Sequence, residues 1–372
     1  MLAKSKQEFI NFFQEIDDYR QDEKVLYPLD EILFLVFTGV LGCAESWDLI
    51  IEYGKQKIDF LKKYFPYDNG LPSKSTLSTV MGMIDKTKFE QWFSSWTKNL
   101  ADLIPQELIA IDGKTIRGSR TGSKKASHVL NAFATKRGIV LAQRMVGEKT
   151  NEIPEIPKLL DDLNIEGAVI SIDAMGCQKD IATKIIDKKA NYFLALKGNH
   201  GTLESEAIHL FKQKENDKFF NYYEEYDKGH GRVEIRKCWS ITAPDWFKNQ
   251  GWKELNSISM IESERFIKGS SSIEQRIYIS SLEADAKQHF NYARQHWLVE
   301  NSVHWVLDVT FREDASQIKN AAENMSVIRK IIINLIRIYK RKIQSKSSLK
   351  ALRMMAAWSD DVAGGIMYGL FV

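Results

Sequence analysis

The sequence predicts an α/β protein with a helical N-terminal part, a mixed core and a mostly β insertion. Apolar residues recur at helical spacing through the first hundred residues. From about residue 107, short apolar runs alternate with helical segments, and from about residue 202 aromatic-rich runs alternate as strands do. We therefore predict five segments: helical 1–103, core 104–201, insertion 202–283, core continued 284–346 and a C-terminal tail 347–372.

Charge is concentrated in two stretches of a chain whose net charge is only +3 over 372 residues. Residues 114–150 carry nine basic side chains against one acidic residue, and residues 326–350 carry eight against none. Such a local excess is typical of a surface that binds phosphate groups, although a solvated surface is the plainer alternative. The total charge by itself does not indicate a nucleic-acid partner.

The cysteines indicate a reducing compartment, and the hydropathy indicates that no segment spans a membrane. Cys43, Cys177 and Cys238 are far apart and form no CxxC pair, so we expect free thiols, as in the cytoplasm. No signal peptide is apparent. The longest apolar run, Ile32–Leu41, is too short for the roughly 18 residues that span a bilayer. We therefore expect no membrane association.

Five helices are expected in the first segment. An apolar repeat over 9–16 marks the first, Pro28 is well placed to begin the second, and Ser46 is a candidate N-cap for the third. The fourth opens at 72–76 and the fifth runs over 86–103. Their apolar stripes are expected to form core. Ser, Thr and Lys side chains at the start of the fourth helix could also hold a DNA backbone, and we predict that this segment binds DNA.

The core segment predicts three strands joined in a meander, followed by units in which helices alternate with strands. This order, β-β-β-α-β-α-β with a further helix after the insertion, is the topology of a ribonuclease H-like nuclease core. The expected strands are 107–112, 128–134, 139–146, 168–173 and 191–196, and the helices between them are 151–163 and 179–188.

Two of the predicted strands end in an aspartate. Asp112 follows the apolar run Leu108–Ile111, and Asp173 follows Ala168–Ile172. If the two strands lie side by side, their carboxylates can share a cation, and such oxygen ligands suit Mg²⁺ or Mn²⁺. Without a cation the two charges would repel each other, and one carboxylate would take a proton. The alternative is an ordinary Asp-Gly turn at the end of a strand.

A third carboxylate is expected from the helix Tyr292–Trp305. Helical spacing places His296, Glu300 and His304 on one face. A histidine–glutamate–histidine face could bind zinc, but the spacing is not that of HExxH and no cysteine accompanies it. We therefore predict that Glu300 completes the carboxylate set and that His296 steers a phosphate or the leaving group.

Further polar residues lie near these elements. Lys197 and Asn199 follow the last core strand, where they could hold a phosphate or orient a water molecule, or simply cap a helix. His200 continues the same stretch. In the insertion, Arg232 and His230 lie in a glycine-containing turn. The two side chains could contact DNA, or the segment could be a simple hairpin turn.

Five motifs occur in order along the chain: IDGKTIRGS around Asp112, SIDAMGCQKDIA around Asp173, LKGNH at 196–200, HGRVE at 230–234 and HWLVENSVHWVLDVTFRED at 296–314. Together they resemble bacterial insertion-sequence DDE transposases of the H-repeat-associated type, in the cut-and-paste group with a β insertion before the catalytic glutamate. The resemblance covers nearly the whole chain. It implies a catalytic triad of Asp112, Asp173 and Glu300.

The chain departs from the wider group at one signature, Tyr-x2-Arg-x3-Glu-x6-Lys. Those positions hold Ala293, His296, Glu300 and Leu307 here. His296 is then a candidate to replace the arginine. Lys197 and Arg294 are candidates for the remaining phosphate contacts, and Lys114 and Arg117 belong to the basic loop 113–125 after the first aspartate.

The resemblance also implies the reaction and the partners. A transposase of this kind would cut the ends of its insertion sequence and join the freed 3′-OH ends to target DNA with two Mg²⁺ or Mn²⁺ ions. The same residues would also serve a metal-dependent DNA nuclease, or an immobilised relic that only binds DNA. The expected partners are the terminal inverted repeats, target DNA and a second copy of the chain on paired ends, in the bacterial cytoplasm near the nucleoid.

Overall fold

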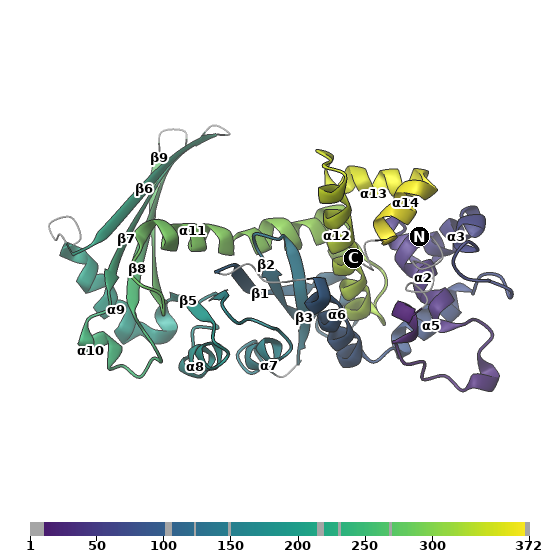
Figure 1. Cartoon of the computed structure of the whole chain (residues 1–372), viewed down its shortest axis with the longest axis horizontal. Coiled ribbons are helices and arrows are strands. Elements are labelled where there is room, and N and C mark those ends of the chain that lie inside the picture. The colour runs from purple at the N-terminus through teal and green to yellow at the C-terminus, as the bar shows by residue number, and fades with distance from the viewer. Residues whose placement is uncertain are drawn as a thin grey trace.

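The computed structural model describes residues 11–100, 106–122, 124–147, 150–213, 219–229, 232–267 and 270–368. The molecule is elongated, with a helical bundle at one end, a twisted sheet at the other and the core strands between them (Figure 1). The long helix α12 (Ala322–Lys342) stands between the bundle and the core strands, and α11 (Ala286–His296) runs along the sheet (Figure 1).

The core sheet has the strand order β3-β2-β1-β4-β5. The first three strands pair antiparallel, whereas β4 pairs parallel with β1 and β5 pairs parallel with β4. This arrangement is the predicted ribonuclease H-like core. Its strands are β1 (Leu108–Ile116), β2 (Ser127–Ala134), β3 (Ile139–Val146), β4 (Val169–Ile172) and β5 (Asn191–Leu196), with helices α7 (Ile156–Asp161) and α8 (Lys179–Asp187).

The insertion continues the core sheet and does not form a separate one. Its last strand, β9, pairs antiparallel with β5, and the full order becomes β3-β2-β1-β4-β5-β9-β8-β7-β6. Because β9 covers the exposed edge of β5, the insertion is placed directly beside the core strands. Its elements are α9 (Gly201–Leu210), β6 (Asn221–Gly229), β7 (Arg232–Thr242), α10 (Asp245–Lys248), β8 (Ser257–Ile267) and β9 (Ser270–Ser280).

The N-terminal part is helical, as predicted. The Ser46 hydroxyl accepts from the amide of Leu49, and Ser73 caps the helix that begins at Lys74. The first predicted helix is described only from residue 11, and residues 11–14 are helical. Within the described residues, no helix combines the length and apolar character needed to cross a membrane. The helices are α2 (Leu29–Leu41), α3 (Trp47–Gln56), α4 (Ile58–Leu61), α5 (Lys74–Met83) and α6 (Lys86–Leu100).

The predicted C-terminal tail is a part of the helical bundle. Helices α13 (Leu349–Trp358) and α14 (Asp360–Met367) share one hydrophobic core with α2 and α12. The buried Arg353 donates to the carbonyl of Val40 and pairs with Glu45, which ties the two ends of the chain together. The segment predicted as a C-terminal tail thus completes the bundle.

Helix α12 (Ala322–Lys342) corrects the prediction that the basic stretch 326–350 forms an exposed, phosphate-binding surface. Arg329 and Lys330 are buried, and Arg337 donates to backbone carbonyls of Gly138 and Ser302. The physical reason is position: α12 packs against both the sheet and the bundle, so its basic face is covered as well as its apolar face. The cationic stretch 326–350 therefore offers no continuous phosphate-binding surface along its first half.

Candidate active site

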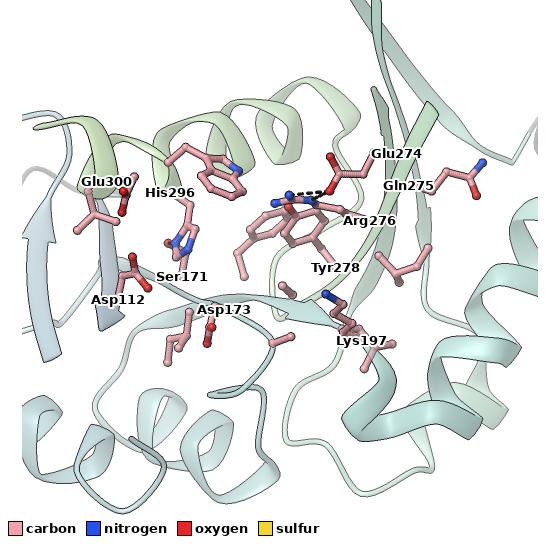
Figure 2. A pocket seen from close by; sticks show the side chains of 18 of the residues that line it. Asp112, Ser171, Asp173, Lys197, Glu274, Gln275, Arg276, Tyr278, His296 and Glu300 are labelled. Carbon is pink, nitrogen blue, oxygen red and sulfur yellow. Dashed lines mark hydrogen bonds and ion pairs between the residues drawn. The ribbon is translucent and has the colours of Figure 1, made fainter. Parts of the chain in front are cut away.

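Asp112 and Asp173 meet at the carboxyl ends of two adjacent parallel strands. Strands β1 and β4 pair in parallel up to Ile111 and Ile172, and the two aspartates are the next residues. β1 itself does not end there, since its pairing with β2 continues to Ile116. The predicted strand end at Asp112 therefore holds for the pairing of β1 with β4 but is wrong for its pairing with β2. Gly113 and Lys114 lie within the strand and do not form a turn. The two carboxylates lie on neighbouring strands of one cavity wall (Figure 2).

Glu300 reaches the same place from a helix. Helix α11 (Ala286–His296) continues through π-helical turns η5 (Glu300–His304) and η6 (Val306–Thr310). Irregular turns of this kind are frequent at functional sites because they re-aim side chains. Ligand atoms of Asp112, Glu300 and His304 lie within 4.8 Å of one another. Asp112 within β1, Asp173 directly after β4 and Glu300 from the helix line one cavity (Figure 2).

The electrostatics of the cluster favour a cation. Burial, followed by the charge of Asp173, raises the pKa of Asp112 to about 7. Burial and the charge of Glu152 also raise the pKa of Asp173. Carboxylates that resist ionisation in each other's presence become good ligands once a divalent ion offsets their repulsion. The donor set, mostly carboxylate oxygen, therefore fits a divalent metal ion such as Mg²⁺ or Mn²⁺.

His296 lies in the same cavity, as the sequence predicts. Its Nδ1 is 2.9 Å from the hydroxyl of Ser171, which is two residues before Asp173. Burial, with the charge of Arg276 next, lowers the pKa of His296 to about 4. The ring is therefore neutral at neutral pH, so any contact it makes to a phosphate depends on hydrogen bonding and not on charge.

His304, which helical spacing places on the same face as Glu300, and Asn131, which the sequence does not indicate, both adjoin the site. Asn131 lies directly opposite Asp112 in the β1–β2 register, so both side chains project from the same face of the sheet. His304 Nδ1 is 2.9 Å from Oε2 of Glu300 and 3.6 Å from Oδ2 of Asp112. Its spacing on the helix face was a usable signal, whereas Asn131 had none because cross-strand register is not visible in sequence.

Glu152 is a fourth carboxylate that the sequence did not indicate. It follows β3, and its Oε1 is 2.6 Å from Nε2 of His128, whose Nδ1 is 3.0 Å from the hydroxyl of Thr115. Its charge acts on both Asp112 and Asp173. An isolated glutamate in a loop carries no pattern that would mark it, so only the folded chain reveals its place.

The close position of Glu152 explains the glycine after Asp112. A Cβ at Gly113 would collide with Oε1 of Glu152 and lie 2.6 Å from Nε2 of His128. These atoms are the far ends of flexible side chains, so we expect Gly113→Ala to displace Glu152 and His128 at modest cost and to lower the DNA cleavage proposed below by about tenfold or less. Gly122→Ala, whose Cβ would meet nothing within 4 Å, is the control. Rates of plasmid nicking for the two variants measure the effect; equal rates would show that the crowding is absorbed without loss.

Two predicted DNA contacts of the basic loop have different surroundings. The side chain of Lys114 is only 6% exposed, and its Nζ pairs with Asp308 at 2.8 Å and Asp314 at 3.2 Å. The prediction that Lys114 binds DNA is therefore wrong, because its charge is already compensated inside the protein. The side chain of Arg117 is 81% exposed, and although its Nε lies 3.6 Å from Oδ2 of Asp314, most of the side chain faces solvent, where a phosphate can approach.

The other predicted contacts are spread over the molecule. Lys197 is exposed and lines the cavity that holds the carboxylates. His200 Nε2 is 2.6 Å from the carbonyl of Cys177, so its ring is engaged by the backbone. Arg294 is exposed but does not line the cavity. The side chains of Asn199 and Arg232 lie outside the described residues.

The cavity has a volume of about 380 Å³ and lies between the core and the insertion. Strand β9 contributes Arg276 and Tyr278, and the guanidinium of Arg276 lies 4.5 Å from the ring centroid of Trp297. Phe193 of β5 stacks on Tyr278 at 4.6 Å. The insertion thus supplies an aromatic wall with an Arg276–Glu274 ion pair beside the acidic cluster (Figure 2). Fold and site together define a ribonuclease H-like protein with a candidate metal centre at its strand ends.

Comparisons with known proteins identify the family. Residues 104–335 match the family described as "Transposase DDE domain", and residues 10–97 match "DDE_Tnp_1-associated". The chain therefore belongs to the DDE transposase family, and its relatives place it with the H-repeat-associated type.

Two relatives cover most of the chain. It is 41% identical to "Putative transposase YncI" of Escherichia coli O157:H7, over 90% of this chain and 88% of that one. It is 38% identical to "H repeat-associated putative transposase YhhI" of Escherichia coli K12, over 91% and 93%. A solved structure, the piggyBac transposase synaptic complex with hairpin DNA, aligns with a TM-score of 0.44 and 11% identity over 99% of this chain and 80% of that chain.

Proposed function

We propose that this protein is a DNA transposase that cuts the ends of an insertion sequence and joins the freed 3′-OH ends to target DNA. The observation that carries the proposal is the convergence of Asp112, Asp173 and Glu300 on one cavity from three elements far apart in sequence. Membership of the DDE transposase family supports it.

The roles of the acidic residues follow from their positions. The charges of both Asp173 and Glu300 act on Asp112, so Asp112 would help to hold two metal ions, one together with Asp173 and the other together with Glu300. When bound, such a pair of ions activates the attacking oxygen and stabilises the departing one. The first attacking oxygen belongs to water and the second to the freed 3′-OH.

Neighbouring residues of the cavity would hold the DNA. His296, whose Nδ1 is engaged by Ser171, retains its other ring nitrogen to donate to a phosphate oxygen. Lys197 is placed to neutralise phosphate charge at the cavity wall, and the exposed Arg117 is placed to do so outside it. We also propose that Arg294, Asn199 and Arg232 contact DNA and that two copies of the chain act on paired ends. Such a protein would work at the nucleoid.

The proposal is tested with DNA that carries the inverted repeats flanking the gene. We expect nicking at the repeat ends that requires Mg²⁺ or Mn²⁺ and is absent on unrelated DNA of equal length. Equal cutting of both substrates would favour a nonspecific nuclease. Salt-dependent binding of the repeats without cleavage in Mn²⁺ would instead indicate a protein that retains DNA binding alone.

A further inference from the structure

The imidazole of His304 lies beside two of the proposed metal ligands. Its side chain is 5% exposed, and Nδ1 lies 2.9 Å from Glu300 and 3.6 Å from Asp112. The π-helical turn that begins at Glu300 brings the two residues to one side of the helix. A buried imidazole is thus directed at the place where two carboxylates from different elements come together.

The separations of these atoms suit a single ion. An octahedral ion with ligands about 2.1 Å away holds adjacent ligand atoms about 3 Å apart and opposite ones about 4.2 Å apart. The ligand atoms of Asp112, Glu300 and His304 all lie within 4.8 Å of one another. Shifts of a few tenths of an ångström would bring the three onto one ion.

Asn131 supplies a second and independent indication. This side chain is fully buried, its Nδ2 is 3.2 Å from Nε2 of His304, and its Oδ1 has no hydrogen-bond partner among the described residues. Half a turn of the amide would present Oδ1 to Nε2 instead. Oδ1 would then accept the Nε2 proton and leave the lone pair of Nδ1 free for a cation, as second-sphere partners of metal-bound histidines do.

We propose that His304 is a nitrogen ligand of the ion shared by Asp112 and Glu300, with Asn131 as the residue that positions its ring. The proposal rests on the function proposed for this site and extends the ligand set beyond three carboxylates. Imidazole binds Mg²⁺ poorly and binds transition-metal ions well, whereas carboxylates accept both. The site should therefore prefer Mn²⁺ to Mg²⁺.

Pulsed EPR of bound Mn²⁺ tests the ligand directly. Electron spin-echo envelope modulation detects a directly coordinated ¹⁴N, and labelling histidine with ¹⁵N changes its frequencies. We expect an imidazole nitrogen coupling in the wild-type protein that His304→Gln abolishes and His296→Gln retains. His296 is the matched control because it lies in the same cavity but outside the ligand group. The wild-type spectrum alone shows whether a histidine coordinates the ion, so a missing nitrogen coupling would overturn the proposal even if a variant folds poorly.

Binding isotherms complete the test. His304→Gln should lower the affinity for Mn²⁺ by about tenfold and leave that for Mg²⁺ within about twofold, and Asn131→Leu should weaken Mn²⁺ binding in the same direction. Mn²⁺ bound through Asp112 without a nitrogen coupling would overturn the role of His304 and spare the proposed function. Mn²⁺ that binds equally to wild type and Asp112→Asn would instead refute the site itself.

Discussion

Asp112→Asn is expected to abolish DNA cleavage and, at the same time, to stabilise the metal-free protein. If Asp112 holds both metal ions as proposed, its loss removes several kcal/mol of transition-state stabilisation, which corresponds to a loss of about a thousandfold or more in rate. The gain in stability has a separate cause, since Asp112 is held among other carboxylates with burial opposing its charge.

The pH dependence of that gain follows from the pKa of Asp112, which rises from 3.8 to about 7 on folding. Between these values the folded protein holds a proton that the unfolded chain has lost. The free energy of unfolding therefore falls as the pH rises from about 4 to 7, and the penalty is complete above pH 7. Asparagine carries no such penalty. We expect the variant to be more stable by about 1–3 kcal/mol at pH 8 in chelator, and by little at pH 4.

Denaturant unfolding at both pH values, with and without Mg²⁺, checks this expectation. Mg²⁺ should stabilise the wild-type protein and leave Asp112→Asn nearly unchanged. Asp22→Asn, at an exposed position remote from the cluster, is the matched control and should follow the wild type. A variant that is less stable than wild type at pH 8 in chelator would show that Asp112 is not under electrostatic strain.

Lys114→Met is expected to destabilise the fold, whereas Arg117→Ala should weaken DNA binding alone. Lys114 pairs with Asp308, Asp314 and the fully buried Glu313, and its removal leaves these carboxylates without one of their cations. Breaking such a buried set costs about 3 kcal/mol. The variant should regain part of this stability at low pH, because the carboxylates then take up protons and no longer need a cation.

The exposed Arg117 provides the contrast. Its replacement should change stability by less than about 0.5 kcal/mol and lower the slope of log affinity against log salt by about 1. Unfolding midpoints and salt-dependent binding to the inverted repeat separate the two variants. A stable Lys114→Met protein with the same reduced salt slope would mean that Lys114 reaches DNA after all.

The sequence predicted the three acidic positions because the pattern that marks each one lies within a few neighbouring residues. An apolar strand followed by an aspartate is visible at Asp112 and Asp173, and helical spacing carries Glu300 to the inner face. The same local view failed at Lys114, where Asp-Gly indicated a turn. Strand β1 continues to Ile116 through its pairing with β2, so alternation places Lys114 on the same face as Asp112, under the segment that carries Asp308 and Asp314.

The basic stretch of α12 shows the same limit. An apolar stripe and a basic remainder predict a surface helix, yet Arg329 and Lys330 are buried because the sheet and the bundle cover opposite sides of α12. Helical periodicity shows which face of a helix is apolar, but it does not show how many of its faces the fold buries. The number of buried faces depends on contacts between distant residues, such as that of Arg337 with the carbonyl of Gly138.

By itself, the sequence determined the order of strands and helices in the ribonuclease H-like core and the three carboxylates that the structure brings to one cavity, because periodicity and the residues that follow apolar strands are properties of a few neighbouring positions. Only the tertiary structure decided that Glu152, His304 and Asn131 belong to the site and that Lys114 does not. Those assignments depend on cross-strand register and on which elements cover each face, and both are set by packing between distant parts of the chain.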